Sequence, residues 1–348
     1  MNFDPERAVL PQDEQGDLRE PHATAVEEFL TPEAQPPNVV GLATGIKWAG
    51  GQPTGEPALV ALVTHKVPED ELREQDRVPA TLQDVQTDVL PIGEPIAGGG
   101  IAESSPQSLA RRERPAQGGY SVGHIRITAG TIGTCAYDIL PGGGVSPPAH
   151  GIGIPPRYYI LSNNHVLANS NAAALGDPVL QPGPVDGGTD PADRIARLSR
   201  FIPITFDPPT PRASHNNLVD AAVAQGEFHD LKREIYWICC VRGWRRRANV
   251  TVGTLVQKTG RTTNYTVGRI TGVNATVDVN YGGSRVARFN DQILATNMSA
   301  GGDSGSLVTT LDDVAVGLLF AGSPQVTILN QIEGVRALLR VEVAEQIL

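Results

Sequence analysis

Cysteine is scarce in this sequence, and its placement excludes a disulfide framework. Only Cys135, Cys239 and Cys240 occur in 348 residues, an odd number with two members adjacent. Secreted domains held by disulfides carry more cysteines, in even numbers. We therefore expect three buried free thiols, because free cysteine behaves as a small apolar residue. The chain also shows no basic start followed by an apolar core, and together these features predict a cytoplasmic protein.

Long apolar runs and positive charge are also in short supply. No run approaches the roughly 18 apolar residues of a membrane-spanning helix, so no membrane segment is predicted. The net charge of −10 leaves no cationic excess to displace counterions from phosphate, which argues against nucleic-acid binding. The seven histidines lack ligand spacing and no phosphate-binding loop is evident. We predict neither a metal nor a nucleotide cofactor.

Glycine and proline, in contrast, are plentiful, with 38 and 28 copies. In residues 119–348 they separate short β-like runs that recur at intervals of about ten to twenty residues, a spacing typical of a β-sandwich or a pair of barrels. The tail, residues 332–348, has helical spacing of its apolar residues and predicts a C-terminal helix that caps this domain.

Three segments of different composition precede this domain. Residues 1–37 are polar and proline-interrupted, and they predict an arm or a capping segment, not a core, with one short helix around Ala25 to Leu30. Residues 38–92 predict a small α+β unit of ββαβ order, with its short helix at residues 68–78. Residues 93–118 are rich in Gly, Pro and Ser and predict a linker. The α+β unit is either a docked structural extension, which would support oligomers, or a regulatory domain that occludes a cleft.

The segment GGDSGSL offers a nucleophile and an oxyanion site. A serine hydroxyl is a weak nucleophile that needs a base, a group that orients the base, and donors for the developing oxyanion. Glycines on both sides of Asp303 and Ser304 permit a tight turn that exposes the serine. The same turn would aim the backbone amides of Gly302 and Ser304 at one point.

Two upstream segments offer the base and the orienting acid. His165, in LSNNHVLA, stands where an apolar strand ends and a short helical turn begins. Asp220, in NLVDAAVAQ, has apolar neighbours, and a carboxylate in such a place needs a buried partner. Asp207, Asp230 and the acids of residues 185–194 stand in loop-like contexts that suit turns better.

These segments resemble those of trypsin-like serine proteases, in the same His, Asp, Ser chain order. LSNNHVLA is similar to the histidine segment of bacterial trypsin-like and HtrA-type proteases, LVDAAVA to their aspartate strand, and GGDSGSLV to the serine motif. The resemblance runs from Gly119 to the C-terminus and implies two packed six-stranded barrels. It predicts a mainly β, chymotrypsin-like double β-barrel with the N-terminal α+β unit and a C-terminal helix. That unit is also distantly similar to the N-terminal region of the plant narrow-leaf protein.

The resemblance also implies a substrate site. Its substrate strand is GLLFAGS, with Phe320, Ala321 and Gly322 along it, which would pair with an extended peptide. The base of the specificity pocket would fall at Met298 or Ser299, where no acid is available. We therefore expect a small or apolar side chain before the scissile bond, and no preference for Lys or Arg.

Asp303 raises a question of activation. In trypsins the matching aspartate pairs with a new N-terminus that cleavage creates. We expect Asp303 to pair instead with an internal Arg or with backbone amides; processing near residues 110–119 is the alternative that would supply an amine.

The leading hypothesis is a serine endopeptidase that acts on peptide or protein substrates through an acyl-enzyme, with His165, Asp220 and Ser304 as its triad. The alternative from another class is a catalytically silent trypsin-fold module that binds partners or serves as a scaffold. An esterase for small molecules is a third option. The natural substrate is open, and so is assembly into a homo-oligomer.

Overall fold

The structure is a computed structural model of the chain, and it describes residues 4–98, 108–139 and 157–343. Its α-helices are short and stand at α1 (Gln12–Asp17), α2 (Arg19–Phe29), α3 (Asn164–Leu167) and α4 (Ile332–Leu339). No helix in the described ranges is long and apolar enough to cross a membrane.

The larger sheet contains a closed barrel. Its strands, in spatial order, are β15 (Leu255–Gly260), β18 (Leu307–Thr310), β19 (Val314–Gly322), β20 (Val326–Gln331), β17 (Val286–Thr296), β16 (Asn264–Asn280), β1 (Val39–Ala49), β2 (Gln52–Val63), β4 (Val85–Pro91) and β3 (Thr81–Leu82). Because β15 also pairs with β16, the first six strands of this order form a ring. One apolar cluster draws residues from all six strands and fills the ring.

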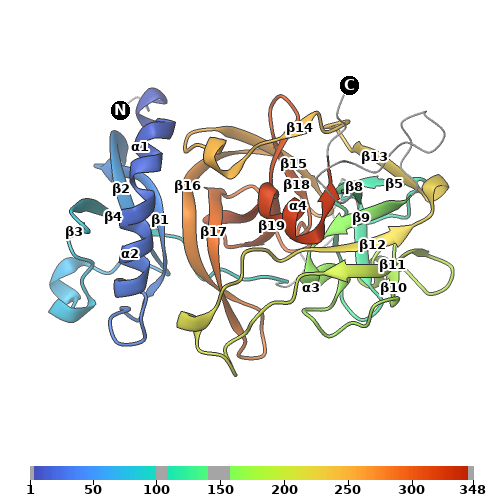
Figure 1. The fold of residues 1–348 in the computed structure, drawn as a ribbon, viewed down its shortest axis with the longest axis horizontal. Coiled ribbons are helices and arrows are strands. Elements are labelled where there is room, and N and C mark those ends of the chain that lie inside the picture. The colour runs from blue at the N-terminus through green and yellow to red at the C-terminus, as the bar shows by residue number, and fades with distance from the viewer. Residues whose placement is uncertain (1–3, 99–107, 140–156, 344–348) are drawn as a thin grey trace.

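The segment upstream of the linker extends this sheet. β1 pairs antiparallel with β16, so β1, β2, β4 and β3 continue the barrel's hydrogen bonding outward. Helix α2 lies across β1 and β2, as Figure 1 shows, and it buries Ala25, Phe29 and Leu30 against them. Of the two alternatives for residues 1–37, an arm and a capping segment, this packing fits the capping segment. Ala25 and Phe29 are spaced one helical turn apart, and this small apolar stripe is enough to cover the sheet.

The helix expected in residues 68–78 is replaced by two single 3-10 turns, Glu69–Glu71 and Glu74–Asp76. Neither turn buries a residue, since this segment offers no apolar face for a helix to pack.

The second sheet curls around a core of its own. Its described strands, in spatial order, are β21 (Val341–Glu342), β8 (Thr134–Asp138), β9 (Tyr158–Ser162), β12 (Ala222–Gly226), β11 (Arg194–Phe201), β10 (Pro178–Leu180), β6 (Ser121–His124) and β7 (Gly130–Thr131). Three short strands complete the described set: β5 (Ala116–Gly118), which pairs with β13 (Leu231–Ile235), and β14 (Gly243–Trp244), which pairs with β19. The second sheet thus has eight described strands where six were expected.

The two curled sheets pack side by side, and α3 and α4 lie near their junction in Figure 1. A shared apolar cluster joins Leu161 and Val219 of the smaller sheet's side to Leu307 and Leu318 of the barrel, with Ile332 of α4 above them. The prediction of a mainly β, chymotrypsin-like double β-barrel with a C-terminal helix is confirmed.

Only one of the three free cysteines is fully buried, which corrects the expectation of three. Cys135 lies on β8 and is buried in the core, and this burial raises the pKa of its thiol to about 12. Cys239 is exposed and Cys240 is half-buried. Cys239 has a left-handed backbone, φ 72°, and lies in the turn that follows β13, so its side chain faces outward.

Candidate active site

His165 and Asp220 come from neighbouring strands of the smaller sheet. His165 lies on α3, the single turn after β9, and Asp220 lies just before β12, which pairs with β9. His165 Nδ1 and Asp220 Oδ2 are 2.6 Å apart, and the His165 backbone N–H donates to Asp220 Oδ1 at 3.1 Å. Asp220 is fully buried and His165 is 8% exposed. The sheet therefore fixes the imidazole from its backbone as well as from its ring.

This contact determines which ring nitrogen of His165 carries the proton. An ionised carboxylate can only accept hydrogen bonds, so His165 Nδ1 is the protonated nitrogen when it faces Asp220. Nε2 then carries the free lone pair. Nε2 is buried and has no hydrogen-bond partner among the described residues. The geometry thus leaves a base whose accepting nitrogen is available.

A third side chain, Tyr281, also holds Asp220. Its hydroxyl donates to Asp220 Oδ2 at 2.6 Å, and its ring meets the His165 ring edge-on, with 6.1 Å between centroids. Burial, reinforced by the charge of Asp220, raises the pKa of Tyr281 well above its usual value, so the hydroxyl stays protonated and donates. Sequence reasoning missed Tyr281, because it stands at the end of β16 without a motif and far from Asp220 in the chain.

Ser304 lies in the turn between β17 and β18, on the barrel side. Gly302 has φ +98°, a conformation that favours glycine. Strand β7 of the other sheet holds the turn, since Thr131 N donates to Ser304 O at 2.8 Å and Thr131 Oγ1 donates to Gly302 O at 2.9 Å. Within the described part of the chain, the backbone amides of Gly302 and Ser304 donate to no protein acceptor. Both predicted oxyanion donors are therefore unengaged.

Two glycines show how near the serine turn lies to α3. A Cβ on Gly130 would be 2.9 Å from Ser304 O and 2.4 Å from a methyl of Val166, the residue after His165. Gly98 lines the same cavity as Ser304, and a Cβ on Gly98 would be 3.5 Å from His165 Cδ2. The structure thus brings the three predicted catalytic residues to the junction of the two sheets.

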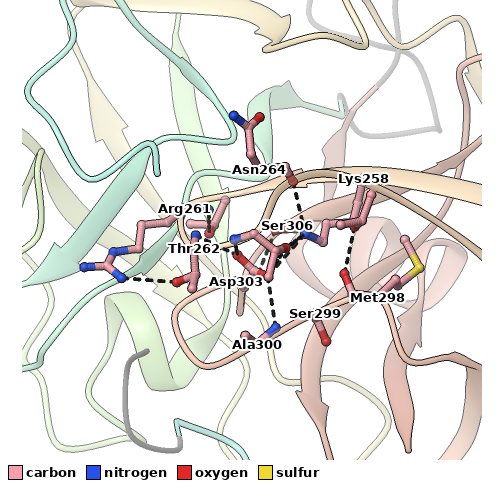
Figure 2. A network of polar contacts seen from close by, with 12 residues as sticks. Lys258, Arg261, Thr262, Asn264, Met298, Ser299, Ala300, Asp303 and Ser306 are labelled. Carbon is pink, nitrogen blue, oxygen red and sulfur yellow. Dashed lines mark hydrogen bonds and ion pairs between the residues drawn. The ribbon is translucent and has the colours of Figure 1, made fainter. Parts of the chain in front are cut away.

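Asp303 is fully buried, and Figure 2 shows the network of polar contacts around its carboxylate. It accepts hydrogen bonds from the backbone amides of Thr262, Thr263 and Ala300 at 2.8, 3.1 and 3.1 Å, and from the Thr263 hydroxyl at 2.6 Å. Lys258 Nζ lies 3.2 Å from Asp303 Oδ2 and is itself fully buried. Burial lowers the pKa of Lys258, and the Asp303 charge opposes that shift.

The cation beside Asp303 is therefore a lysine, where an arginine was expected; the amide partners were expected. Arg261, which is next to this network in Figure 2, pairs instead with Asp186. Because Lys258 comes from β15 of the same barrel, the serine turn is held without an amine from a newly made N-terminus. The processing alternative near residues 110–119 is not needed to explain this geometry.

A cavity of about 440 Å³ opens beside Ser304. Three of the five predicted substrate-binding residues line it: Ser299, Ala321 and Gly322. Met298 does not, because its side chain packs in the barrel interior. Phe320 does not either, because it is fully buried with its ring centroid 4.7 Å from that of Phe289. The Met298 side chain belongs to the core, which corrects its placement at the base of the pocket. The Phe320 ring also packs in the core, and its expected backbone pairing with a peptide stays a prediction.

One acid does line the cavity, although not at Met298 or Ser299, where none was expected. Glu94 lines the cavity, although it comes from the predicted linker and not from the strands around Ser304. It is exposed, and its Oε1 accepts a hydrogen bond from Asn280 Nδ2 at 2.8 Å. The carboxylate thus lies on a surface segment and is already engaged, whereas Ser299 and Asn297 provide neutral polar lining.

A second cavity, of about 610 Å³, lies between α2 and strands β16 and β17. It shares no lining residue with the first, and its residues Arg247 and Arg288 pair with Asp291 and Asp278. No cluster of His, Cys, Asp and Glu within the described ranges has the arrangement of a metal site.

The curled sheets, with the site at their junction, give a chymotrypsin-like fold. No protein-family model and no curated protein matches the sequence. Solved serine proteases resemble the structure. Thermobifida fusca Protease A has 13% sequence identity and a TM-score of 0.44, with 66% of this chain and 98% of that chain covered. Nocardiopsis protease has 17% identity, the same TM-score and the same coverage. The HtrA-type protease AlgW with a decapeptide has 15% identity and a TM-score of 0.33, with 61% and 51% covered.

Proposed function

We propose that this protein is a serine endopeptidase that cleaves peptide bonds through an acyl-enzyme. Ser304 is its nucleophile, His165 its base and Asp220 the acid that orients the base. The observation that carries the proposal is the buried 2.6 Å contact between His165 Nδ1 and Asp220 Oδ2, beside a serine turn with two unengaged amides. Removing a carboxylate and an imidazole from water costs free energy of folding, and their contact with each other only partly offsets that cost. Because such buried pairs cluster at functional sites, this pair favours a functional role.

In the first half of the reaction, Ser304 Oγ attacks the carbonyl carbon of the scissile peptide bond while His165 Nε2 takes the hydroxyl proton. The carbonyl oxygen becomes an oxyanion, which the amides of Gly302 and Ser304 stabilise. His165 is then an imidazolium, and its charge is balanced by Asp220. Nε2 returns the proton to the leaving amine, the carbon–nitrogen bond breaks, and the acyl group remains on Ser304.

In the second half, water attacks the acyl carbon of the ester on Ser304. His165 Nε2 takes a proton from that water and returns it to Ser304 Oγ as the ester bond breaks. Asp220 and Tyr281 stay in place throughout, since neither needs to change protonation. The peptide with the new carboxylate then leaves the groove along Ala321 and Gly322.

The lining of the cavity supports a preference for small uncharged side chains before the scissile bond. Ser299, Ala300 and Ala321 offer short side chains, and Asn297 adds a neutral amide. We expect a chromogenic peptide panel to be cleaved mainly after small or apolar residues. Cleavage mainly after Arg would contradict this specificity.

Labelling with a fluorophosphonate tests the proposed function, because this probe phosphonylates only an activated serine. We expect the wild-type chain to be labelled and Ser304→Ala to remain unlabelled. Ser199→Ala, which removes a serine on β11 outside the site, is the matched control and should be labelled like wild type. A folded wild-type chain that takes no label would favour the silent binding module instead.

A further inference from the structure

Residues 94–98 of the predicted linker lie along the substrate strand β19. Ile96 N donates to Gly322 O at 3.0 Å, and Gly322 N donates to Ile96 O at 3.2 Å. This reciprocal pair is an antiparallel β-bridge, and it uses both backbone polar groups of Gly322. An extended peptide that adds to this strand would need the same two groups. Segment 94–98 and a substrate therefore compete for Gly322.

The other edge of the segment is fixed to the end of β16. Ala97 N donates to Asn280 O at 3.0 Å, and Asn280 N donates to Pro95 O at 2.9 Å. Through isolated β-bridges at Ile96, segment 94–98 thus lies between β16 and β19. The Ile96 side chain is 42% exposed, so backbone pairing holds the segment here more than burial of that side chain does.

The segment reaches the catalytic residues but does not present a bond for attack. Gly98 lines the cavity beside Ser304 and lies against His165. Its φ of +64° is left-handed, so the chain turns at this residue. A scissile bond has to be held with its carbonyl carbon aligned to the nucleophile, which an extended strand achieves and a turn interrupts. The segment pairs as a substrate does up to Ile96 and then departs from the substrate path.

We propose that segment 94–98 is a resident inhibitory strand, which an extended peptide must displace before it can bind. This inference rests on the proposed protease function. The ligand class is an extended peptide with a free N–H and C=O opposite Gly322 and small residues near Ser304, as in the Ile-Ala-Gly sequence of the segment itself. Because the segment is tethered, it competes at a high effective concentration, and the apparent affinity for peptides falls with the fraction of open groove.

The test measures peptide binding without catalysis, in a Ser304→Ala background. A fluorescein-labelled peptide with the sequence of residues 93–98 is titrated, and its anisotropy is recorded. Ile96→Pro removes the N–H that pairs with Gly322 O and should raise the affinity about tenfold or more, because the groove opens. Ile96→Ala keeps the backbone pairing and trims an exposed side chain, so its affinity should stay within about threefold of the parent. Equal affinities for Ile96→Pro and the parent would overturn the proposal.

A second variant guards against misfolding of Ile96→Pro, which thermal unfolding would reveal. In it, residues 94–98 are replaced by five Gly and Ser residues, which keep the length and lose the ordered strand. This variant should bind the labelled peptide more tightly than the parent as well. If it folds and its affinity is unchanged, the segment is no inhibitor.

Measurements with Ser304 intact separate this proposal from the proposed function. Ile96→Pro should raise kcat/KM for peptide substrates while fluorophosphonate labelling, which needs no strand pairing, changes much less. If Ile96→Pro binds the peptide more tightly but no variant is labelled, the protease function is rejected. The proposal that segment 94–98 blocks the groove is then still supported. Cleavage of the chain at Gly98, detected by mass spectrometry in the wild type but not in Ser304→Ala, would show that the segment is a substrate. That result would overturn its role as an inhibitor.

Discussion

The carboxylate of Asp220 accepts hydrogen bonds from the backbone of His165, from its ring and from the hydroxyl of Tyr281. The Tyr281 bond is charge-assisted and buried, and such a bond contributes about 1.5–3 kcal/mol. We predict that Tyr281→Phe lowers kcat/KM about tenfold, because Asp220 then orients the imidazole less well. The measurement is kcat/KM on a peptide substrate together with the rate of fluorophosphonate labelling.

Tyr265→Phe is the control for this prediction. Tyr265 is 41% exposed and donates to Gln257 Oε1, away from the site. Its removal should leave both rates at the wild-type level. If Tyr281→Phe also retains full activity while it unfolds more easily, the hydroxyl stabilises the fold and does not position Asp220.

The roles of residues that stand in a short sequence motif could be predicted from the sequence. The roles of residues that act through contacts distant in the chain could not. Ser304, His165 and Asp220 each stand in a short segment whose neighbours predict their setting. Tyr281 and Lys258 stand in ordinary strand sequence, where a lysine usually faces solvent and a tyrosine gives no indication of a partner. Their roles arise only when the barrel closes, since each meets its acid across many residues of chain.

At the scale of elements, the serine turn depends on β15 through Lys258. Removing one partner of a buried ion pair leaves the other charge uncompensated, at about 3–5 kcal/mol. We therefore predict that Lys258→Met lowers the free energy of unfolding by about that amount and abolishes labelling of Ser304, because Asp303 no longer holds the turn. Urea unfolding and fluorophosphonate labelling measure the two effects.

The double variant Lys258→Met, Asp303→Asn checks the cause. It removes both charges, so its loss of stability should be smaller than the sum of the losses of Lys258→Met and Asp303→Asn measured singly. Arg112→Met breaks an exposed pair with Asp193 and should change the free energy of unfolding by about 1 kcal/mol or less. Normal labelling of Lys258→Met would show that the backbone amides alone keep the turn in place.

The strands of the barrel could be predicted from composition and periodicity. Which strands and segments pair with one another could not. Nothing in the sequence of β1 indicates that it pairs with β16, because the backbone N–H and C=O groups that form the ladder are the same in almost every residue. For the same reason, the Gly- and Pro-rich composition of segment 94–98 predicts a linker and conceals its pairing with β19. The division of the chain at residues 38, 93 and 119 stays a prediction.

At the scale of the whole molecule, the upstream chain carries two separable roles. Helix α2 with β1 and β2 covers one side of the barrel, and the five residues 94–98 fill part of its groove. The structural-extension reading of residues 38–92 agrees with this cover, whereas we propose a regulatory role only for segment 94–98, which belongs to the predicted linker. Truncation removes the first role, and substitution in segment 94–98 removes only the second.

We predict that deleting residues 1–92 makes the protein aggregate, without activating it. The deletion uncovers the β16 edge and the apolar face that Val60 and Leu62 bury against Val277 and Phe289. An exposed edge next to an apolar face is a site for intermolecular pairing. Light scattering and fluorophosphonate labelling measure the outcome, with a chain that lacks only residues 1–5 as the soluble control. A soluble and more active 93–348 chain would show instead that α2, β1 and β2 are regulatory, and that the barrel is stable on its own.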